Sequence, residues 1–595
     1  MKENSKNSIR EYGSRLVCIA LCCLLGALMI EALTLFGAPF ASVFDFNAWS
    51  TTRIVITWIA LLVLSGFIAQ RSQSHRRGGR KTELIRLLKG VCCALLPSIC
   101  ILLSLLAARY IISIDLLTVP TIGIIAAVIF AALCVVSLRS YLSDKPENIY
   151  LPVGIAFALV FCLLVPVDTS VSWDDQIHYD RAVAISYLFS PEYTEADRVM
   201  LNPDPSLAGG YSAPSEGYIS YLCSLEQLSK IEFEKCVGPV SSLGFNTLSY
   251  QAIGYLPMAF GLWLSRLLHL SFVATFLLGR LFNAVFFMAL VYLGMSRLRV
   301  GKAVVIVFSL LPTVVFLSAS YSYDPWCIGW LLYGFLRYIS WHQHPSFKMS
   351  GREAVIVISA FALGCGPKAI YFPIFFILLF VPHSFFASKK QMNGYRTAVV
   401  GISIAVLATF LAPFLYNGPG SGDDRGGSDV NSTAQVSWIL ANPISYVYVI
   451  ASFLKDYLSP ASSSGYTDVI VYLSPASLRS FPLAALLIFA VVDNGGATHL
   501  YSGWRYKVAA ALLLVGTTAL ISTALYISFT PVAHYTVNGC TARYLLPIIA
   551  PILILGFNLK SVYGGSRTVL NGAAFSAAIA FNAWACFHSI VHVYA

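Results

Sequence analysis

The residues best suited to chemistry form a dense polar cluster at Trp173–Arg181, which reads WDDQIHYDR. The cluster combines aspartates, a histidine and an arginine, in a chain in which only 11% of the residues are charged. Neighbouring carboxylates and a histidine are suited to general acid–base catalysis, because they can accept and return a proton near neutral pH. Asp174 and Asp175 are therefore candidate catalytic residues. His178 joins them, because it follows Asp174 by one helical turn and lies on the same face.

The same stretch also has a structural interpretation. Ser172 followed by Asp175 fits the S-x-x-D pattern of a helix start, where acids in the first turn are favoured by the helix dipole. His178 could equally fix the Asp174 carboxylate instead of acting on a substrate. The last two residues of the cluster fit a solvated helix face. The cluster thus predicts the start of a helix, and its acidic residues cap the helix, take part in catalysis or do both.

Three more polar residues stand beside apolar stretches far along the chain. Asp324 lies between Tyr323 and Pro325 at the start of a predicted helix, where capping is an alternative to a site role. Lys368 and Arg543 are both suited to binding phosphate, and Arg543 can make a bidentate contact. The alternative for these two residues is snorkelling or anchoring at a membrane interface.

The composition is that of an integral membrane protein. The chain has 595 residues, 57% of them hydrophobic, and its mean hydropathy is +0.73. Repeated apolar runs predict transmembrane helices, since about 20 residues cross the hydrocarbon core. Most of the 14 cysteines fall inside these runs, but Cys223 and Cys236 share a polar loop and could pair. The net charge of +11 comes from short loops, so it indicates orientation and not nucleic-acid binding.

The first predicted spans place the polar cluster outside the cytoplasm. The loop at 70–89 is rich in arginine and lysine, so it and the N-terminus should be cytoplasmic. The fifth span then delivers the polar cluster to a long extracytoplasmic loop at 168–271. These spans lie at about Leu16–Gly37, Ile54–Ala69, Gly90–Ile112, Val119–Leu138 and Leu151–Val167.

The apolar stretch Met258–Leu270 could be a short span or a helix lying in the membrane interface. If it crosses, the basic loops around Arg299 and Lys348 lie outside the cell. If it lies in the interface, these loops and the one around Lys389 become cytoplasmic, in agreement with the positive-inside rule. This choice also puts Asp324 on the same side as the polar cluster. We therefore predict an interfacial helix.

The rest of the chain predicts ten more spans, several of them short, with breaks at Pro312, Pro367 and Pro373 as in helices that line a polar cavity. We therefore expect an all-α integral membrane bundle of about fifteen transmembrane helices. Its predicted parts are an extension of four spans at 1–148, a core module at 149–416, a second outer loop at 417–477 and a C-terminal module at 478–595. The ten spans lie at about Phe272–Met295, Val304–Tyr321, Trp326–Ile339, Ala354–Gly366, Ala369–Val381, Thr397–Tyr416, Leu478–Val492, Val508–Ile527, Leu545–Leu559 and Val569–His588.

Four motifs in order resemble those of a large family of predicted bacterial membrane proteins of unknown function. WDDQIH at 173–178 is similar to the family's P-D-E-x-x-H stretch. YLP at 255–257 with FLLGRLFN at 276–283 resembles its Y-L-P and LGRLxN run. SASYSYDP at 318–325 resembles S-x-S-Y-D, and NGCTARYLLP at 538–547 resembles G-x-x-x-R-Y-x-x-P. The resemblance extends over Leu151–Phe587, with Trp173 in place of the proline and Asp175 in place of the glutamate.

That family in turn resembles the GT-C superfamily of membrane glycosyltransferases, such as the lipid A aminoarabinose transferase and the protein mannosyltransferases. These enzymes use polyprenyl-phosphate-linked sugars as donors. The resemblance implies a first outer loop that opens with an acidic pair, juxtamembrane helices and a second outward-facing aspartate. Asp174-Asp175 and Asp324 occupy those places here.

The implied reaction transfers a sugar to an extracytoplasmic glycan, lipid or protein of the cell envelope. A base, for which Asp174 is the leading candidate, deprotonates the acceptor, while cationic groups stabilise the leaving phosphate. An Mg²⁺ or Mn²⁺ ion, if one is used, would be held by Asp175 and Asp324. The candidate residues are Asp174, Asp175 and His178 for catalysis, and Tyr255, Asp324, Lys368 and Arg543 for substrate binding.

Two other functions fit a membrane bundle of this kind. A transporter or flippase for lipid-linked glycans would need the same lipid groove without catalysis, and a non-catalytic protein of envelope assembly would not need the acidic cluster. A transporter should show repeated halves and charges near the bilayer midplane. The sequence has no evident repeat, and its candidate residues collect on one face. We therefore expect a multi-pass enzyme of the cytoplasmic membrane with an extracytoplasmic active face.

Overall fold

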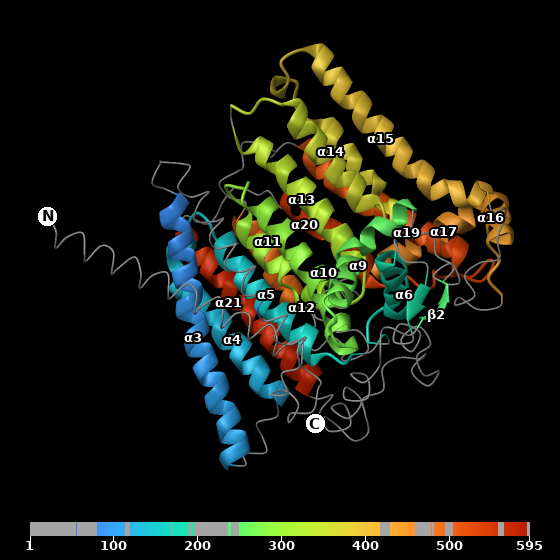
Figure 1. Ribbon diagram of the computed structural model, residues 1–595. Coiled ribbons are helices and arrows are strands. Elements are labelled where there is room, and N and C mark those ends of the chain that lie inside the picture. Colours follow the sequence, from blue (N-terminus) through green and yellow to red (C-terminus); the bar gives the residue numbers. More distant parts are fainter. Residues whose placement is uncertain are drawn as a thin grey trace.

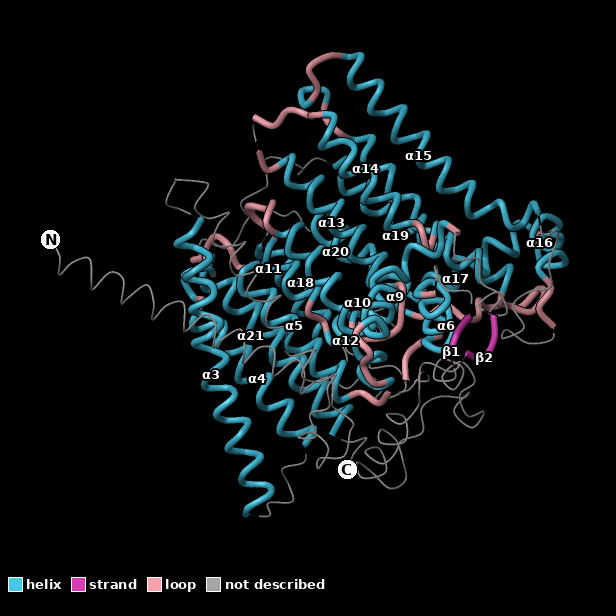
Figure 2. The backbone as a smooth tube through the Cα atoms, in the orientation of Figure 1, coloured by secondary structure: helices cyan, strands magenta, loops and turns pink. Residues whose placement is uncertain are grey.

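The computed structural model shows a bundle of helices. It describes residues 80–112, 119–167, 171–187, 249–344, 346–416, 429–458, 481–493, 504–556 and 565–591, with short pieces at 55, 169, 192–194, 236–239 and 478. In this part of the chain the fold is helical apart from two short antiparallel strands, β1 (Glu192–Thr194) and β2 (Cys236–Pro239). Figure 2 shows these strands beside the helices. The possible pair of Cys223 and Cys236 lies outside the described side chains.

The long helices lie side by side through the bundle (Figure 1). Helix α4 packs between α3 and α5, and α21 packs against α4, so the predicted N-terminal extension contacts the predicted C-terminal module. The helices of this layer and of the core are α3 (Arg80–Ile112), α4 (Val119–Ser137), α5 (Glu147–Leu164), α10 (Phe272–Met295), α13 (Asp324–His342), α14 (Gly351–Cys365), α15 (Lys389–Tyr416), α18 (Phe481–Asp493), α19 (Trp504–Ser528), α20 (Leu546–Gly556) and α21 (Arg567–Cys586).

Six helices within the described residues are long and apolar enough to cross a membrane, and each overlaps a predicted span. The structure therefore supports a helical membrane protein but does not confirm about fifteen spans. Apart from Val55, the first two predicted spans lie outside the described residues. The six segments are Glu83–Leu106, Pro120–Ser137, Glu147–Leu164, Phe272–Met295, Lys507–Ser528 and Arg567–Ile590.

Several other predicted spans are helices too short or too interrupted to qualify. The predicted span Val304–Tyr321 is divided into α11 (Lys302–Ser309) and α12 (Pro312–Ser318). The division falls at Pro312 because proline has no N–H to continue the first helix. The predicted span Ala369–Val381 is the 3₁₀ helix η6 (Ala369–Phe380). The sequence pattern located these apolar segments and the break at Pro312, but it did not reveal that the second segment is a 3₁₀ helix.

Helix α21 compensates the break between α11 and α12. The side-chain amide of Asn582 donates to the carbonyl of Leu310 at 2.7 Å and to the carbonyl of Ala578 at 2.9 Å. Asn582 is fully buried. A carbonyl freed at a helix end must find a donor when no water reaches it. Asn582 supplies that donor to Leu310.

Helix α5 separates two polar ends of the bundle. At its start, Glu147 pairs with Lys302 at 2.8 Å, next to the basic loop that follows α10. At its end, Arg280 of α10 donates to the carbonyls of residues 165 and 166 at 3.3 and 3.0 Å. Its 18 residues rise about 27 Å, close to the thickness of a hydrocarbon core. The basic loop and the polar cluster therefore lie at opposite ends of a membrane-length helix.

Helix α9 (Leu256–Leu267) fits the interfacial position predicted from charge. Its 12 residues rise only about 18 Å, which is too short to cross. One face packs against α10 and against α6 (Asp175–Ser186). The other face is apolar and exposed, and its residues recur at helical spacing. They are Leu256, Phe260, Trp263 and Leu267.

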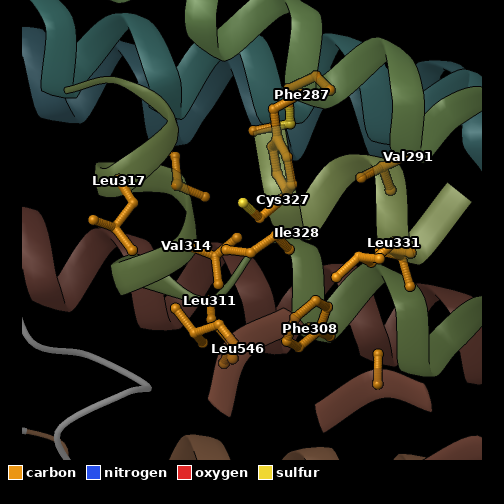
Figure 3. Close-up of a cluster of buried hydrophobic side chains, with 14 of the residues drawn as sticks. Phe287, Val291, Phe308, Leu311, Val314, Leu317, Cys327, Ile328, Leu331 and Leu546 are labelled. Carbon is orange, nitrogen blue, oxygen red and sulfur yellow. The ribbon is translucent and has the colours of Figure 1, made fainter. Parts of the chain in front are cut away.

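A dense apolar core joins the central helices (Figure 3). It draws Phe287 and Val291 from α10, Phe308 from α11 and Leu546 from α20. Cys327 of α13 lies in this core, as expected for a cysteine that acts as a small apolar residue. All the side chains labelled there are 1% exposed or less. This packing fixes α13, whose first residue is Asp324.

The Asn582→Ala substitution should lower the melting temperature of the detergent-solubilised protein. It leaves the Leu310 carbonyl buried without its donor, which costs about 1–3 kcal/mol. The matched control is Ser576→Ala on the same helix, where an exposed hydroxyl bonds only within α21. Equal melting temperatures for the two variants would contradict a role for Asn582 at the break.

Candidate functional site

Asp174 stands at the start of α6 with its backbone in the left-handed region, at φ 55°. This region is unfavourable for residues with a Cβ, although Asp and Asn tolerate it better than most. The adjacent Asp175 is buried, and its Oδ2 accepts hydrogen bonds from the N–H groups of Val171 and Ser172 at 3.1 and 2.9 Å. Asp175 thus makes half of the S-x-x-D pattern, the bond back to the Ser172 N–H, while the Ser172 hydroxyl makes none within the described residues and no side-chain bond caps α6, whose N-cap is Asp174. Asp175 fixes the turn that presents Asp174.

Arg543 approaches Asp174 from the distant 3₁₀ helix η11 (Ala542–Leu545). Its Nη2 lies 2.7 Å from Oδ2 of Asp174, and its Nη1 donates to the carbonyl of Trp173 at 3.3 Å. The guanidinium also lies over the ring of Trp173, 5.1 Å from its centroid. Only 5% of the Arg543 side chain is exposed, so anchoring at an interface is the wrong interpretation.

The backbone around Arg543 is held from two sides. The hydroxyl of Tyr457 donates to the carbonyl of Thr541 at 2.8 Å, and the hydroxyl of Tyr371 in η6 donates to the carbonyl of Tyr544 at 2.9 Å. Tyr457 ends helix α17 (Pro443–Tyr457), which is bent by 108° from α16 (Ser432–Ala441). The described helices of the predicted second outer loop therefore help to position Arg543.

Asp324 forms the buried centre of the site. Its Oδ1 lies 2.9 Å from Nζ of Lys368, and its Oδ2 lies 3.7 Å from Nη1 of Arg543. The Asp324 and Lys368 side chains are 5% and 9% exposed, so Lys368 does not snorkel. Burial alone would raise the pKa of Asp324, but the charges of Lys368 and Arg543 outweigh burial and hold that pKa below its usual value. Asp324 is therefore ionised in the folded protein.

The turn before Asp324 is fixed from α10. The side-chain amide of Asn283 donates to the carbonyls of Ser320 and Ser322 at 3.0 Å each. The hydroxyl of Ser322 then accepts from the N–H of Asp324 at 3.1 Å. Asn283 is fully buried, so these bonds are made without competition from water. They aim the start of α13 at the cluster.

We call Asp174, Asp324, Lys368 and Arg543 the charged quartet. Aromatic rings surround its cations: Nζ of Lys368 lies 4.8 Å from the ring centroid of Tyr323 and 4.3 Å from that of Tyr544. Two carboxylates and two cations from four separate segments thus converge at one end of the bundle. Ring faces favour a cation that has lost water, which compensates part of the cost of burying Lys368.

His178 and Tyr255 form a second layer behind the quartet. The Nδ1 atom of His178 lies 3.1 Å from the hydroxyl of Tyr255, which also accepts from Arg181 at 3.2 Å. The His178 ring packs edge-on against Tyr323, with centroids 4.7 Å apart. Burial and the nearby charge of Arg543 lower the pKa of His178 to about 3, so the ring is neutral at pH 7. The expectation that His178 fixes the Asp174 carboxylate is wrong, because its bond goes to Tyr255.

Tyr255 lies where the 3₁₀ helix η5 (Tyr250–Tyr255) meets α9, close to the Lys368 turn. Gly254 makes this approach possible. A Cβ at Gly254 would lie 2.5 Å from Cγ of Pro367 and 3.0 Å from Cβ of Tyr323. Any side chain there would push η5 away from the quartet, so the backbone contact requires glycine.

Asp180 and Arg181 do not form the solvated face expected from the sequence. Arg181 bonds to Tyr255 and so belongs to the second layer. Asp180 is half-buried, and its Oδ1 is shielded from solvent without a hydrogen bond. Burial, opposed only in part by Arg181, raises the pKa of Asp180 to about 6. Burial of a carboxylate in this manner destabilises the fold at neutral pH.

A pocket of about 180 Å³ opens beside the quartet. Lys368 and Tyr544 line its polar side, and Gln251 contributes from η5. Its remaining walls are apolar and come from Pro367, from the start of η6 and from α19, a candidate span. They are Pro367, Ala369, Ile370, Ile521, Ala524 and Leu525. The pocket therefore joins apolar walls, three of whose residues belong to a candidate span, to the cation of Lys368.

The predicted metal ligands are engaged with other groups. The described residues contain no group of three or more His, Cys, Asp or Glu that could hold an ion. Asp175 accepts bonds from backbone N–H groups, and Asp324 pairs with Lys368. A cation already beside Asp324 does not fit a divalent-ion site, which collects carboxylate and carbonyl oxygens. The Mg²⁺ or Mn²⁺ assignment stays a prediction, and no step below depends on it.

Comparison with known proteins agrees with the membrane architecture. The family described as "Predicted membrane protein (DUF2142)" matches residues 240–552, more than half of the chain. The chain belongs to the DUF2142 family. No curated protein and no solved structure matches it. The DUF2142 match is narrower than the extent expected from the motifs: it includes Tyr255, Asp324, Lys368 and Arg543, but begins after the polar cluster.

The structure brings together six of the seven predicted site residues, and Asp175 supports their geometry from the turn. The sequence interpretation missed Arg181 and the rings of Trp173, Tyr323 and Tyr544. A signal for the rings was present: each is the direct neighbour in sequence of Asp174, Asp324 or Arg543.

The Asp180→Asn substitution should stabilise the protein at pH 8. Because the folded pKa of Asp180 lies near 6, above its ordinary value, the penalty for the buried carboxylate is complete above pH 6 and is lost as the pH falls toward 4. After allowance for solvent screening the gain should be on the order of 1 kcal/mol. Melting temperatures from pH 4 to 8 test this. Asp456→Asn changes an exposed carboxylate of α17 and is the control.

Proposed function

We propose that this membrane protein is a glycosyltransferase of the GT-C type. It would move a sugar from a polyprenyl-phosphate-linked donor to an extracytoplasmic glycan, lipid or protein. The observation that supports this most is the arrangement at one end of the bundle. Two buried cations, Lys368 and Arg543, lie beside the part-exposed carboxylate of Asp174 and next to a largely apolar pocket.

The chemistry of transfer matches these groups. The acceptor loses its proton to Asp174, its oxygen or nitrogen attacks the anomeric carbon, and the bond from that carbon to the phosphate oxygen breaks. Polyprenyl phosphate leaves, and its charge is stabilised by Lys368 and Arg543. Of the two carboxylates in the quartet, Asp174 is the one suited to meet an acceptor, because 37% of its side chain is exposed against 5% for Asp324.

The proposal includes the membrane orientation predicted from charge. The N-terminus and the basic loops face the cytoplasm, and the quartet faces outward at the cytoplasmic membrane. The other helices at predicted spans, including the short and interrupted ones, count as crossings, which gives about fifteen with the two predicted spans that precede α3; α9 is excluded because the charge distribution predicts it to lie in the interface. The separation of the Glu147–Lys302 pair from the quartet by the length of α5 supports this arrangement.

The Asp174→Asn substitution should abolish sugar transfer. The purified protein in nanodiscs is incubated with a panel of polyprenyl-phosphate hexoses and aminosugars and with a cell-envelope extract as the source of acceptor, and release of polyprenyl phosphate is measured. Loss of the general base should reduce release about 10²- to 10⁴-fold. Asp144→Asn makes the same change at the exposed, opposite end of the bundle and should leave release unchanged.

Full release by Asp174→Asn would remove Asp174 as the base. Binding of the donors without release by the unsubstituted protein would favour a transporter or flippase.

The topology has a separate test. In intact cells, a membrane-impermeant maleimide should label Tyr535→Cys, because residue 535 is 88% exposed in the loop before Arg543. Ser296→Cys, exposed in the basic loop after α10, should react only after the cells are opened. Labelling is compared with that of the parent chain. Reaction of Ser296→Cys from outside would contradict the one-sided site.

A further inference from the structure

The charged quartet has no surplus of positive charge with which to receive an anion. Asp174 and Asp324 balance Lys368 and Arg543. The second layer adds none, since Arg181 follows Asp180 directly and His178 is held by Tyr255. A phosphate entering this site would meet two carboxylates that already hold both cations. Like charges this close repel strongly where little water is present. Anion binding therefore requires one carboxylate to give up its cation.

The two carboxylates differ in how easily they can do so. Asp324 is 5% exposed, contacts both cations and sits on a turn fixed by Asn283. If it lost its partners it would be a buried, unpaired charge, which is strongly unfavourable. Asp174 is 37% exposed, so its carboxylate can exchange Arg543 for water at much lower cost. Asp174 is thus the residue that can leave.

The pocket gives an anion a path to the same cations. Lys368 and Tyr544 line the pocket directly, and Tyr544 follows Arg543 in the chain. Arg543 does not line the pocket, but Lys368 and Arg543 both contact Asp324, so a phosphate held by Lys368 at this wall lies near the guanidinium. The guanidinium has several N–H donors in one plane, so it can keep the Trp173 carbonyl while it exchanges a carboxylate for a phosphate oxygen.

We propose that Arg543 is an exchange residue: a phosphate monoester or diester displaces Asp174 from Arg543, while Asp324 stays in place. The identity of the phosphate as that of a lipid-linked donor rests on the proposed function. The exchange frees the Asp174 carboxylate from its cation only when the anion is bound. A base paired with arginine is a weak proton acceptor, so Asp174 becomes competent only in the presence of the donor. The ion pair keeps the empty site inactive.

The exchange makes a counterintuitive prediction about binding. The Asp174→Asn substitution, which should abolish transfer, should also tighten binding of farnesyl phosphate, a short isoprenoid phosphate without a sugar. Removing the competitor for Arg543 should raise affinity about three- to tenfold. The affinity is measured by calorimetry on the full chain in nanodiscs. Asn is well suited to the left-handed backbone of residue 174. Gly is equally compatible with this backbone, so Asp174→Gly should also raise the affinity for farnesyl phosphate.

A double-substitution cycle isolates the exchange from a general change of charge. In an Arg543→Gln background, Asp174→Asn should no longer tighten binding, because the contested cation is gone. Asp180→Asn removes a negative charge from the same helix without touching Arg543 and should have little effect. Three results would overturn the exchange. Asp180→Asn could raise the affinity for farnesyl phosphate as much as Asp174→Asn does, the increase caused by Asp174→Asn could persist in the Arg543→Gln background, or the protein could fail to bind farnesyl phosphate. Melting temperatures confirm that each variant is folded.

The exchange and the proposed function can fail separately. Suppose that Asp174→Asn binds farnesyl phosphate more tightly and the unsubstituted protein releases no polyprenyl phosphate from the sugar donors: this would support the exchange and reject the transferase. If release of polyprenyl phosphate depends on Asp174 but Asp174→Asn does not bind farnesyl phosphate more tightly, the transferase is supported and the exchange is rejected. Inorganic phosphate, tested in parallel, separates recognition of the phosphate from recognition of the isoprenoid chain.

Discussion

The pairing of buried charges at Asp324 is the constraint on which the rest of the site depends. A carboxylate that is 5% exposed can remain ionised only beside cations, and Lys368 and Arg543 supply them at 2.9 and 3.7 Å. These residues come from the start of α13, the turn before η6 and the helix η11. Their mutual compensation brings three distant segments to one point. Loss of any member would leave the others uncompensated, so the site forms as a unit.

The bundle places this unit at one end of the membrane-length helix α5. Helix α5 puts about 27 Å between the Glu147–Lys302 pair and the loop that leads to Asp174. A site at the end of a membrane-length helix can meet a lipid-linked substrate from the bilayer and a polar one from water. The exposed apolar face of α9 and the apolar walls of the pocket fit the same boundary. The proposed transfer and the proposed ion exchange both use this position.

Sequence reasoning located most of the site but few of its contacts. Scarcity of charge made Asp174, Asp324, Lys368 and Arg543 visible, because an ionised residue in an apolar chain needs a specific reason to be there. Charge distribution also predicted a non-crossing segment near Met258–Leu270, where the structure has the short helix α9. The contacts between these residues could not be predicted from the sequence, since a pair such as Asp174 and Arg543 is separated by 369 positions.

The amino-acid sequence by itself determined that this is a helical membrane protein and which of its segments are apolar. It also showed which charged residues lie in or beside apolar segments and therefore need a specific role. These properties follow from local composition and from the energy of transferring each residue into lipid. Only the tertiary structure decided that Asp175 bonds to the turn before α6, that His178 bonds to Tyr255 and that Lys368 is buried. It also decided that the segment Ala369–Phe380 forms the 3₁₀ helix η6. Those outcomes depend on the three-dimensional neighbours of each group, because burial and partner choice are set by packing between segments that the sequence keeps far apart.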